Sequence, residues 1–302
     1  MSIFHLPYAL VDVFAERALE GNMLAICTDA RRLSTEQMQA LARETNLAET
    51  TFIFPAEDPE TERRDGVRVR IFTTQEELPF AGHPTLGTAS WLYFNHPLLR
   101  GAEVVTLKLN VGPISVRFDA PTQDRPGVFG TMRQNDPVFG MVHDREEIAR
   151  VLHVPIEDLD NTYPIQTVST GMAFCIVPFK SLQALARLEI PQAAAQVYLD
   201  GCKCKFFYCL ARVDSANADF HARMQFYNGE DPATGSGAGC AISWMVRHGL
   251  VVSGVTTVIE QGIEIRRPSR LYVRASSGAA KIHDVFVGGR TISVASGTFF
   301  LP

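Results

Sequence analysis

An internal repeat narrows the folds open to this chain more than any single element does. The string GHPTLGTASWL at residues 82–92 aligns without gaps on GSGAGCAISWM at residues 235–245, and the only two tryptophans, Trp91 and Trp244, fall at the same register. A weaker echo pairs MQALAR at residues 38–43 with LQALAR at residues 182–187. Two such coincidences in the same order predict two homologous halves, each built around one apolar helix. The alternative is a chance similarity between alanine-rich helices.

Length and composition fit two halves and exclude several classes of protein. The 302 residues, 46% of them hydrophobic, suffice for two ordinary cores and exclude a disordered chain. A net charge of −5 without a basic stripe argues against nucleic acid and anionic lipid as partners. No window approaches the ~20 apolar residues of a membrane span, and the first ten residues lack a signal-peptide pattern. Six cysteines in such a chain indicate reduced thiols, so we expect a cytoplasmic protein.

The hydrophobic pattern alternates strands with a few helices. In the first half a capped helix is expected from Ser34 to about residue 46, and a buried helix from Pro84 onward. The turn-rich stretch at residues 119–127 marks a crossing between the halves. In the second half we expect helices at residues 145–152 and 181–187, and a loop at residues 228–234. Strands are expected at residues 10–14, 23–27, 51–54, 67–73, 104–110, 114–118, 203–213 and 222–227.

Both copies of the repeat lead a loop of small residues into the start of a buried helix. The free N–H groups and partial positive charge at such a start favour a carboxylate or phosphate. If the halves face each other across a pseudo-twofold axis, the two starts converge on one cleft, where small ligands usually bind. The polar residues of the two loops are His83 in the first copy and Glu230, Asp231, Thr234 and Ser236 in the second.

Several longer strings carry a specific resemblance. They are EGN at residues 20–22, NLAETTF at 46–52, RIFT at 70–73, ELPFAGHPTLGTA at 77–89, EDPATGS at 230–236, QG at 261–262, RPSR at 267–270 and VGGR at 287–290. Through these strings, and over essentially its whole length, the chain resembles the PhzF family of phenazine-biosynthesis-like isomerases, which share the diaminopimelate-epimerase fold. Gly21-Asn22-Met23 replaces the usual Gly-Asn-Pro, so the substrate itself stays open.

The resemblance implies an α+β fold of two pseudo-symmetric diaminopimelate-epimerase-like domains. Each domain is a curved mixed sheet wrapped around a central helix. Residues 1–122 and 287–302 form the first domain, to which the last strand returns, and residues 128–286 form the second. The active site lies in the cleft between them. Members of the family are homodimers, so a homodimer is implied for this chain.

The resemblance also implies the activity. It is a cofactor-independent isomerase, similar to 2,3-dihydro-3-hydroxyanthranilate isomerase, that moves a proton on a small cyclic or unsaturated carboxylic acid. Such chemistry needs one carboxyl group that lifts a proton from carbon and returns it elsewhere, and Glu49 matches the residue with this role. His83 and Asp231 are the other implied catalytic residues. Each has a simpler interpretation, a solvated loop side chain for Glu49 and a helix cap for His83 and Asp231.

The helix starts supply the expected substrate-binding residues, Gly82, Thr234, Gly235 and Ser236. Backbone N–H groups around Gly235, with the Ser236 hydroxyl, are the candidates for holding a substrate carboxylate. At a helix N-terminus His83 should have a lowered pKa and remain a neutral hydrogen-bonding imidazole.

Other signals are weaker. Epimerases of this fold use two cysteines at the helix starts, but those positions are Ala81 and Thr234 here, and Cys27 and Cys240 fit small buried hydrophobes. GSGAG mimics a dinucleotide loop, yet an acidic segment separates it from the preceding strand. Cys202-Lys-Cys204 suggests zinc but lacks a second ligand pair in sequence, so neither metal nor cofactor is expected. The alternatives are an epimerase or dehydratase of an amino or hydroxy acid, and a non-catalytic ligand-binding protein of the same fold.

Overall fold

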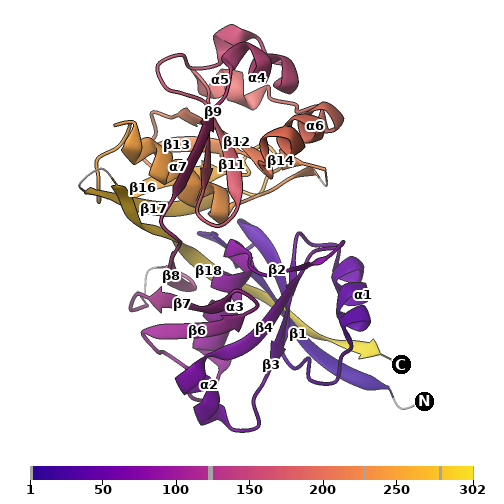
Figure 1. Ribbon diagram of the computed structural model, residues 1–302. Helices are drawn as coiled ribbons and strands as arrows, with labels where there is room; N and C mark the ends of the chain where they lie inside the picture. The colour runs from indigo at the N-terminus through magenta and orange to yellow at the C-terminus, as the bar shows by residue number, and fades with distance from the viewer. Residues whose placement is uncertain (1–2, 122–124, 228, 279–280, 302) are drawn as a thin grey trace. The chain divides into compact units, whose positions relative to one another are not determined.

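The computed structural model describes residues 3–121, 125–227, 229–278 and 281–301 (Figure 1). The chain divides into two compact units, Met1–Met132 with Gly288–Pro302 and Arg133–Val287. This division assigns residues 128–132 to the first unit, whereas the sequence analysis begins the second domain at residue 128. The expected boundary at residue 122 and the expected loop start at Asn228 lie outside the described residues.

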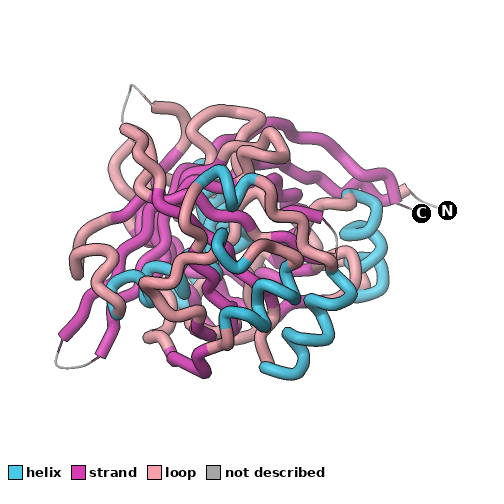
Figure 2. The backbone as a smooth tube through the Cα atoms, turned by 90° about the horizontal axis from the view of Figure 1, so that it is seen from above, coloured by secondary structure: helices cyan, strands magenta, loops and turns pink. Residues whose placement is uncertain are grey.

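The first unit contains a closed ring of strands. Most neighbours are antiparallel, while β2 with β3 and β4 with β6 are parallel, so the sheet is mixed. The last strand returns to the first and closes the ring: Phe4 pairs with Leu301, which places the two chain ends side by side (Figure 2). In ring order the strands are β1 (Phe4–Val13), β2 (Asn22–Cys27), β3 (Thr50–Phe54), β4 (Val67–Phe72), β6 (Val104–Leu109), β7 (Gly112–Phe118), β8 (Val128–Arg133) and β18 (Lys281–Leu301).

Helix α3 (Gly82–Asn95) packs against five strands of this ring, β1, β2, β3, β6 and β7. Its sequence is apolar almost all round, and every residue from Gly82 to Ser90 is buried, as the pattern predicts. Gly87 allows the close approach, because a Cβ there would lie 2.7 Å from side-chain atoms of both Val13 and Leu24. The oxygen atoms of Thr51 and Thr88 lie 2.9 Å apart and join β3 to the helix.

Helix α1 (Thr35–Thr45) lies outside the ring (Figure 1). Ser34 and Gln37 form a capping box at its start, and Asn46 ends it in the left-handed conformation, both near the predicted positions. Met38 joins Phe52 and Phe72 in the core under the helix. The remaining short elements of this unit are α2 (Pro59–Asp65) and β5 (Glu77–Leu78).

The second unit has a mixed sheet around a second buried helix, α7 (Gly235–Arg247). Helix α7 packs on β17, β11 and β10, and the fully buried Trp244 donates from Nε1 to the carbonyl of Pro164 at 3.1 Å. The sheet runs from β18 through β17 (Ser269–Gly278), β16 (Thr257–Gln261), β13 (Phe220–Arg223), β12 (Phe206–Arg212), β11 (Ala173–Pro178) and β10 (Gln166–Ser169) to β9 (Val138–Val142).

The remaining helices of this unit build a further apolar core. Ile148, Leu152, Leu185 and Phe207 are among its buried members. Two of these helices were predicted, and α6 was not recognised from the sequence. They are α4 (Arg145–Leu152), the 3₁₀ turn η1 (Ile156–Asp158), α5 (Leu182–Ala186) and α6 (Gln192–Cys202).

One predicted strand, residues 222–227, is wrong in its extent. Strand β13 ends at Arg223, and β14 (Gln225–Phe226) forms a separate hairpin with β15 (Gly229–Glu230). At the break, the carbonyl of Met224 accepts the backbone N–H of Asp231, seven residues further along the chain, at 2.9 Å. The turn carries Asp231 back toward β13.

Helices packed on mixed sheets confirm the α+β class. Within the described part of the chain, no helix has both the length and the apolar character needed to cross a membrane.

Candidate active site

The first group of candidate residues lies at the start of α3. Ala81 is the N-cap residue, and its methyl side chain cannot accept a hydrogen bond from the N–H groups of the first turn. His83, in that first turn, is only 5% exposed. Its Nδ1 lies 3.3 Å from Nδ2, the side-chain amide nitrogen, of Asn22 at the start of β2.

Glu49 lies beside this histidine. It occupies the connection between α1 and β3, where the hydroxyl oxygens of Thr45 and Thr50 lie 2.8 Å apart and brace the connection. Its Oε2 is 3.6 Å from Nε2 of His83, and its side chain is 16% exposed. The structure therefore brings together two of the predicted catalytic residues, and Asn22 joins them.

His83 is an electrically neutral neighbour for Glu49. Burial lowers the pKa of the imidazole to about 3, and a hydrogen bond with the backbone of Met23 opposes this only in part. The ring is thus uncharged at neutral pH, as expected, although burial is the main cause. Nε2 is buried and has no hydrogen-bond partner among the described residues.

The second group lies at the start of α7. Thr234 is the N-cap residue, and its side chain makes no capping hydrogen bond to the first turn of this helix. The Thr234 hydroxyl donates to Oδ2 of the buried Asp231 at 2.7 Å. Gln261 holds the same turn: its Nε2 donates to the Asp231 carbonyl at 2.8 Å, and its Oε1 accepts the Thr234 N–H at 3.2 Å. Tyr208 donates to that Oε1 at 3.3 Å.

Gln134 supports the helix start from another side. Its Nε2 donates to the carbonyl of Gly235 at 3.0 Å, and its Oε1 accepts from the Thr170 hydroxyl at 2.7 Å. This contact depends on Gly239, where a Cβ would lie 1.9 Å from Oε1 of Gln134. Gly239 therefore allows the polar side chain of Gln134 to reach the backbone of α7.

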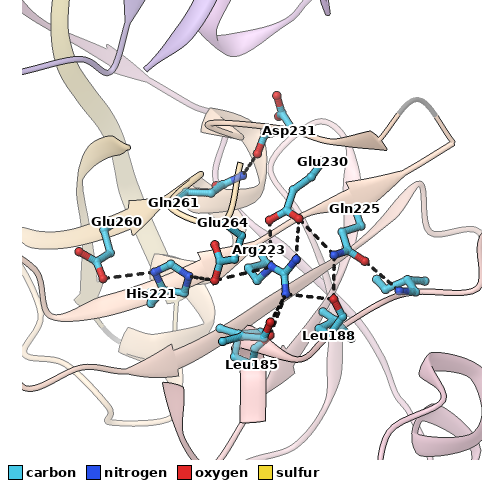
Figure 3. A network of polar contacts seen from close by, with 12 residues as sticks. Leu185, Leu188, His221, Arg223, Gln225, Glu230, Asp231, Glu260, Gln261 and Glu264 are labelled. Atoms are coloured by element: carbon cyan, nitrogen blue, oxygen red, sulfur yellow. Dashed lines mark hydrogen bonds and ion pairs between the residues drawn. The ribbon is translucent and has the colours of Figure 1, made fainter. Parts of the chain in front are cut away.

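A charged network fixes the segment before Asp231 (Figure 3). Arg223, 5% exposed, donates to both carboxylate oxygens of Glu230 at 2.9 and 2.6 Å. Its Nη1 also donates to three carbonyls near the end of α5, at 3.1, 3.0 and 3.0 Å. Gln225 adds a bond to Glu230 at 3.1 Å. Asp231 thus follows directly after a rigidly held residue.

His221 continues this network between two carboxylates. Its Nδ1 lies 3.2 Å from Glu260 and its Nε2 lies 2.9 Å from Glu264 (Figure 3). Burial lowers the pKa of His221, but the hydrogen bonds with the two carboxylates outweigh burial and raise it to about 9. His221 is therefore an imidazolium at neutral pH.

The predicted site residues thus form two sets. Glu49, His83 and Gly82 lie in the first unit, and Asp231, Thr234, Gly235 and Ser236 lie in the second. That both sets face one substrate stays a prediction. Four residues that structure the two helix starts were not predicted as site residues: Asn22, Gln134, Tyr208 and Gln261. Of these four, Asn22 and Gln261 lie in strings that carry the family resemblance. The rest are brought in by long-range contacts.

The structure can be compared with two alternative interpretations of the sequence, a pair of catalytic cysteines and a dinucleotide-binding loop. Ala81 and Thr234 are the N-cap residues of α3 and α7, so no sulfur stands at either position. Cys27 and Cys240 are buried as predicted, and burial raises the pKa of both thiols, to about 12 and about 11. The glycine-rich string begins helix α7 after a turn rather than directly after a strand, unlike a dinucleotide loop.

Comparison with known proteins gives the family. The profile of the PhzC-PhzF family, described as phenazine biosynthesis-like protein, matches residues 11–297. Trans-2,3-dihydro-3-hydroxyanthranilate isomerase of Pseudomonas aeruginosa is 34% identical over 304 residues, which cover 97% of this chain and 99% of that protein.

Two solved structures have a fold similar to that of this chain. A predicted epimerase from Pseudomonas aeruginosa, 34% identical, matches with a TM-score of 0.81 over 97% of this chain and 99% of its own. A PhzF-family phenazine biosynthesis protein from Bacillus anthracis shares the fold with a TM-score of 0.86 at 24% identity, over 98% of this chain and 99% of its own. The chain therefore belongs to the PhzC-PhzF family of phenazine biosynthesis-like proteins and, like its named relatives, is an isomerase.

Proposed function

We propose that this isomerase works without a cofactor and moves a proton between two carbons of a small cyclic or unsaturated carboxylic acid. The 34% identity to trans-2,3-dihydro-3-hydroxyanthranilate isomerase supports a substrate of this kind. The observation that carries the proposal is Nε2 of His83, a buried polar atom with no hydrogen-bond partner among the described residues, 3.6 Å from Oε2 of Glu49.

An unsatisfied buried polar atom costs about 1–3 kcal/mol. A polar group of a substrate placed against Nε2 of His83 recovers this free energy, so the atom marks a place for a ligand. Because His83 is neutral, it orients the substrate without neutralising the carboxylate of Glu49. Glu49 then keeps its basicity for the reaction.

Glu49 is the group that moves the proton. Its carboxylate takes a proton from a substrate carbon, and the electron pair of that C–H bond shifts the neighbouring double bond. The resulting carboxylic acid returns the proton to a different carbon. Nothing is oxidised or reduced and no atom is lost, so the step needs neither redox cofactor nor metal.

The start of α7 is the proposed site for the substrate carboxylate. The side chain of its N-cap residue, Thr234, makes no capping hydrogen bond, and N–H groups at such a helix start favour an anion. The Thr234 hydroxyl already donates to Asp231, so that carboxylate is held in place beside the helix start. We assign Asp231 a catalytic role at the substrate, and Gly82, Thr234, Gly235 and Ser236 the role of binding it.

The repeat supports the finer description of the fold. Helices α3 and α7 begin at the aligned glycines Gly82 and Gly235, and each is the buried helix of its own unit. We therefore propose that the units are pseudo-symmetric copies of one ancestral domain, which together act on a single substrate. Assembly into a homodimer stays a prediction.

The alternatives are less well supported. Racemisation by two thiols needs a cysteine at each helix start, and Ala81 and Thr234 hold those places. A non-catalytic binding protein of the same fold is disfavoured by the isomerase names of the relatives.

The experiment compares two neighbouring glutamates. In deuterated water, with trans-2,3-dihydro-3-hydroxyanthranilate as substrate, Glu49→Gln should lose at least ~10²-fold in turnover and in deuterium incorporation, the usual scale of general acid/base catalysis. Glu44→Gln, on the exposed side of α1, is the matched control and should keep the parent rate. Full activity of Glu49→Gln would refute the role of Glu49. Deuterium incorporation by the parent with no isomerised product would refute the proposed reaction.

A further inference from the structure

A cluster of sulfur and nitrogen atoms in the second unit lies outside the machinery described above. His143, Cys202 and Cys204 each offer one metal-ligating atom, and the three atoms lie within 4.8 Å of one another. His143 and Cys204 are buried, while Cys202 is partly exposed and leaves a route from solvent. The sequence alone showed two cysteines without a partner, because the histidine comes from a distant segment.

The backbone brings these ligands together from separate elements. His143 lies between β9 and α4. Cys202 is the last residue of α6, and Lys203 ends that helix in the left-handed conformation with φ 58°. This turn reverses the chain so that Cys204 comes back beside Cys202 before β12 begins.

Hydrogen bonds orient the histidine as in a metal site. Nδ1 of His143 lies 2.7 Å from the hydroxyl of Tyr198, one turn before Cys202 on α6. A metal-ligating histidine commonly donates its second ring N–H to such an outer partner. The other nitrogen, Nε2, lies 2.7 Å from the hydroxyl of Thr167, and that hydroxyl lies 3.0 Å from Sγ of Cys204. One small hydroxyl therefore stands between the two ligand atoms.

We propose that His143, Cys202 and Cys204 bind a zinc ion, with water as the fourth ligand. Two sulfurs and one imidazole form a donor set that zinc prefers. Bonds of ~2.0–2.3 Å in a tetrahedral site place the ligand atoms roughly 3.5 Å apart, which lies inside the 4.8 Å within which the three atoms already stand.

The protons balance on binding. Each thiol releases its proton to solvent and ligates as thiolate, while His143 ligates through Nε2 and donates from Nδ1 to Tyr198. The hydroxyl of Thr167, freed from Nε2, donates to the thiolate of Cys204. No group is oxidised or reduced.

The ion would tie the end of α6 to the connection between β9 and α4. None of its three protein ligands is a residue assigned above to the isomerase reaction. Zinc binding and isomerase activity are therefore separate properties, and each can fail without the other.

Cobalt is the spectroscopic probe for this site. The full chain is purified with a chelator and a phosphine reductant, the chelator is removed, and Co²⁺ is added. We expect one cobalt per chain, a sulfur-to-cobalt charge-transfer band, tetrahedral d–d bands, and displacement of cobalt by Zn²⁺. Cys202→Ser and Cys204→Ser should each lose most of the charge-transfer intensity. Cys27→Ser, a buried cysteine of the first unit, is the matched control and should keep the parent spectrum.

Two further variants sharpen the test. Tyr198→Phe keeps the ring and removes the outer hydrogen bond, and should weaken cobalt affinity by roughly 10- to 100-fold. Cys202 is the partly exposed cysteine ligand, so Cys202→Ser should disturb folding less than Cys204→Ser. Circular dichroism of the variant checks that it is folded. A parent without a charge-transfer band, or a Cys202→Ser variant that keeps the full band, would overturn the proposal.

Discussion

Replacing His221 with glutamine removes the imidazolium that Glu260 and Glu264 hold between them. The histidine is 1% exposed and both ring nitrogens have a carboxylate partner, at 3.2 and 2.9 Å. Its pKa in the folded protein is about 9, compared with an ordinary value of 6.5. The unfolded chain therefore releases this proton at lower pH than the folded chain does.

This difference in the pKa of His221 between the folded and unfolded states sets the sign and size of the pH dependence of the free energy of unfolding. Below pH 6.5 both states hold the proton, and the ion pairs contribute their full stability. Between about pH 6.5 and pH 9 the folded state binds more protons than the unfolded state, so the free energy of unfolding falls as the pH rises. A shift from 6.5 to about 9 corresponds to a loss of the order of 3 kcal/mol across this window.

Urea unfolding of the parent and of His221→Gln at a series of pH values measures this loss. The variant should be less stable at about pH 6, because Glu260 and Glu264 then lose the imidazolium between them and Glu264 keeps only Arg223, 3.8 Å away, as a cationic partner. The difference in stability should shrink by an amount of the order of 3 kcal/mol toward about pH 9. His5→Gln, an exposed histidine of β1, is the control and should follow the parent curve. Parallel curves for the parent and His221→Gln over the whole range would refute the reasoning.

Two other substitutions test the start of α7. Ser236→Asp should weaken binding of an acidic substrate at least ~10-fold, since like charges placed together cost several kcal/mol; calorimetry of Ser236→Asp and Ser236→Asn measures this, and equal affinities would exclude an anion at this turn. Gly239→Ala should destabilise the fold by ~1–3 kcal/mol, because its Cβ would displace Gln134 from Gly235 and Thr170. At Gly201 of α6 an added Cβ would have nothing within 4 Å, so Gly201→Ala should instead stabilise the protein by ~0.5–1 kcal/mol. Equal melting temperatures for Gly239→Ala and Gly201→Ala would contradict this packing argument.

The parts of the fold that local chemistry decides were predictable from sequence. Ser34 and Gln37 indicate the start of α1 in the sequence, because a capping box involves only residues close together in the chain. The apolar strings that begin at Gly82 and Gly235 could only be buried helices, and both are. The family resemblance placed Glu49 and His83, which belong to separate strings, in one predicted site, and their 3.6 Å separation was not predicted.

The parts that distant contacts decide were not predictable. The strand at residues 222–227 is interrupted because Met224 accepts a hydrogen bond from Asp231, which no local pattern reveals. Arg223 reads as an ordinary strand residue until the structure places Glu230 and the end of α5 around it. In the same way, His143 reaches Cys202 and Cys204 only through the packing of α6.

The pairing of β18 with β1 has a consequence for folding during synthesis. The ring of the first unit is complete only when residues 291–301 pair with β1, and these residues leave the ribosome after the whole second unit. Until then β1 has an unpaired edge, which can template pairing with another chain. The second unit is contiguous in sequence, and the first is completed only by residues that follow it, so the second unit is an insertion inside a domain that is still unfinished when the second has been made. A nascent chain stalled before residue 291 therefore carries all of the second unit and an open sheet in the first, and the open sheet is its aggregation-prone part.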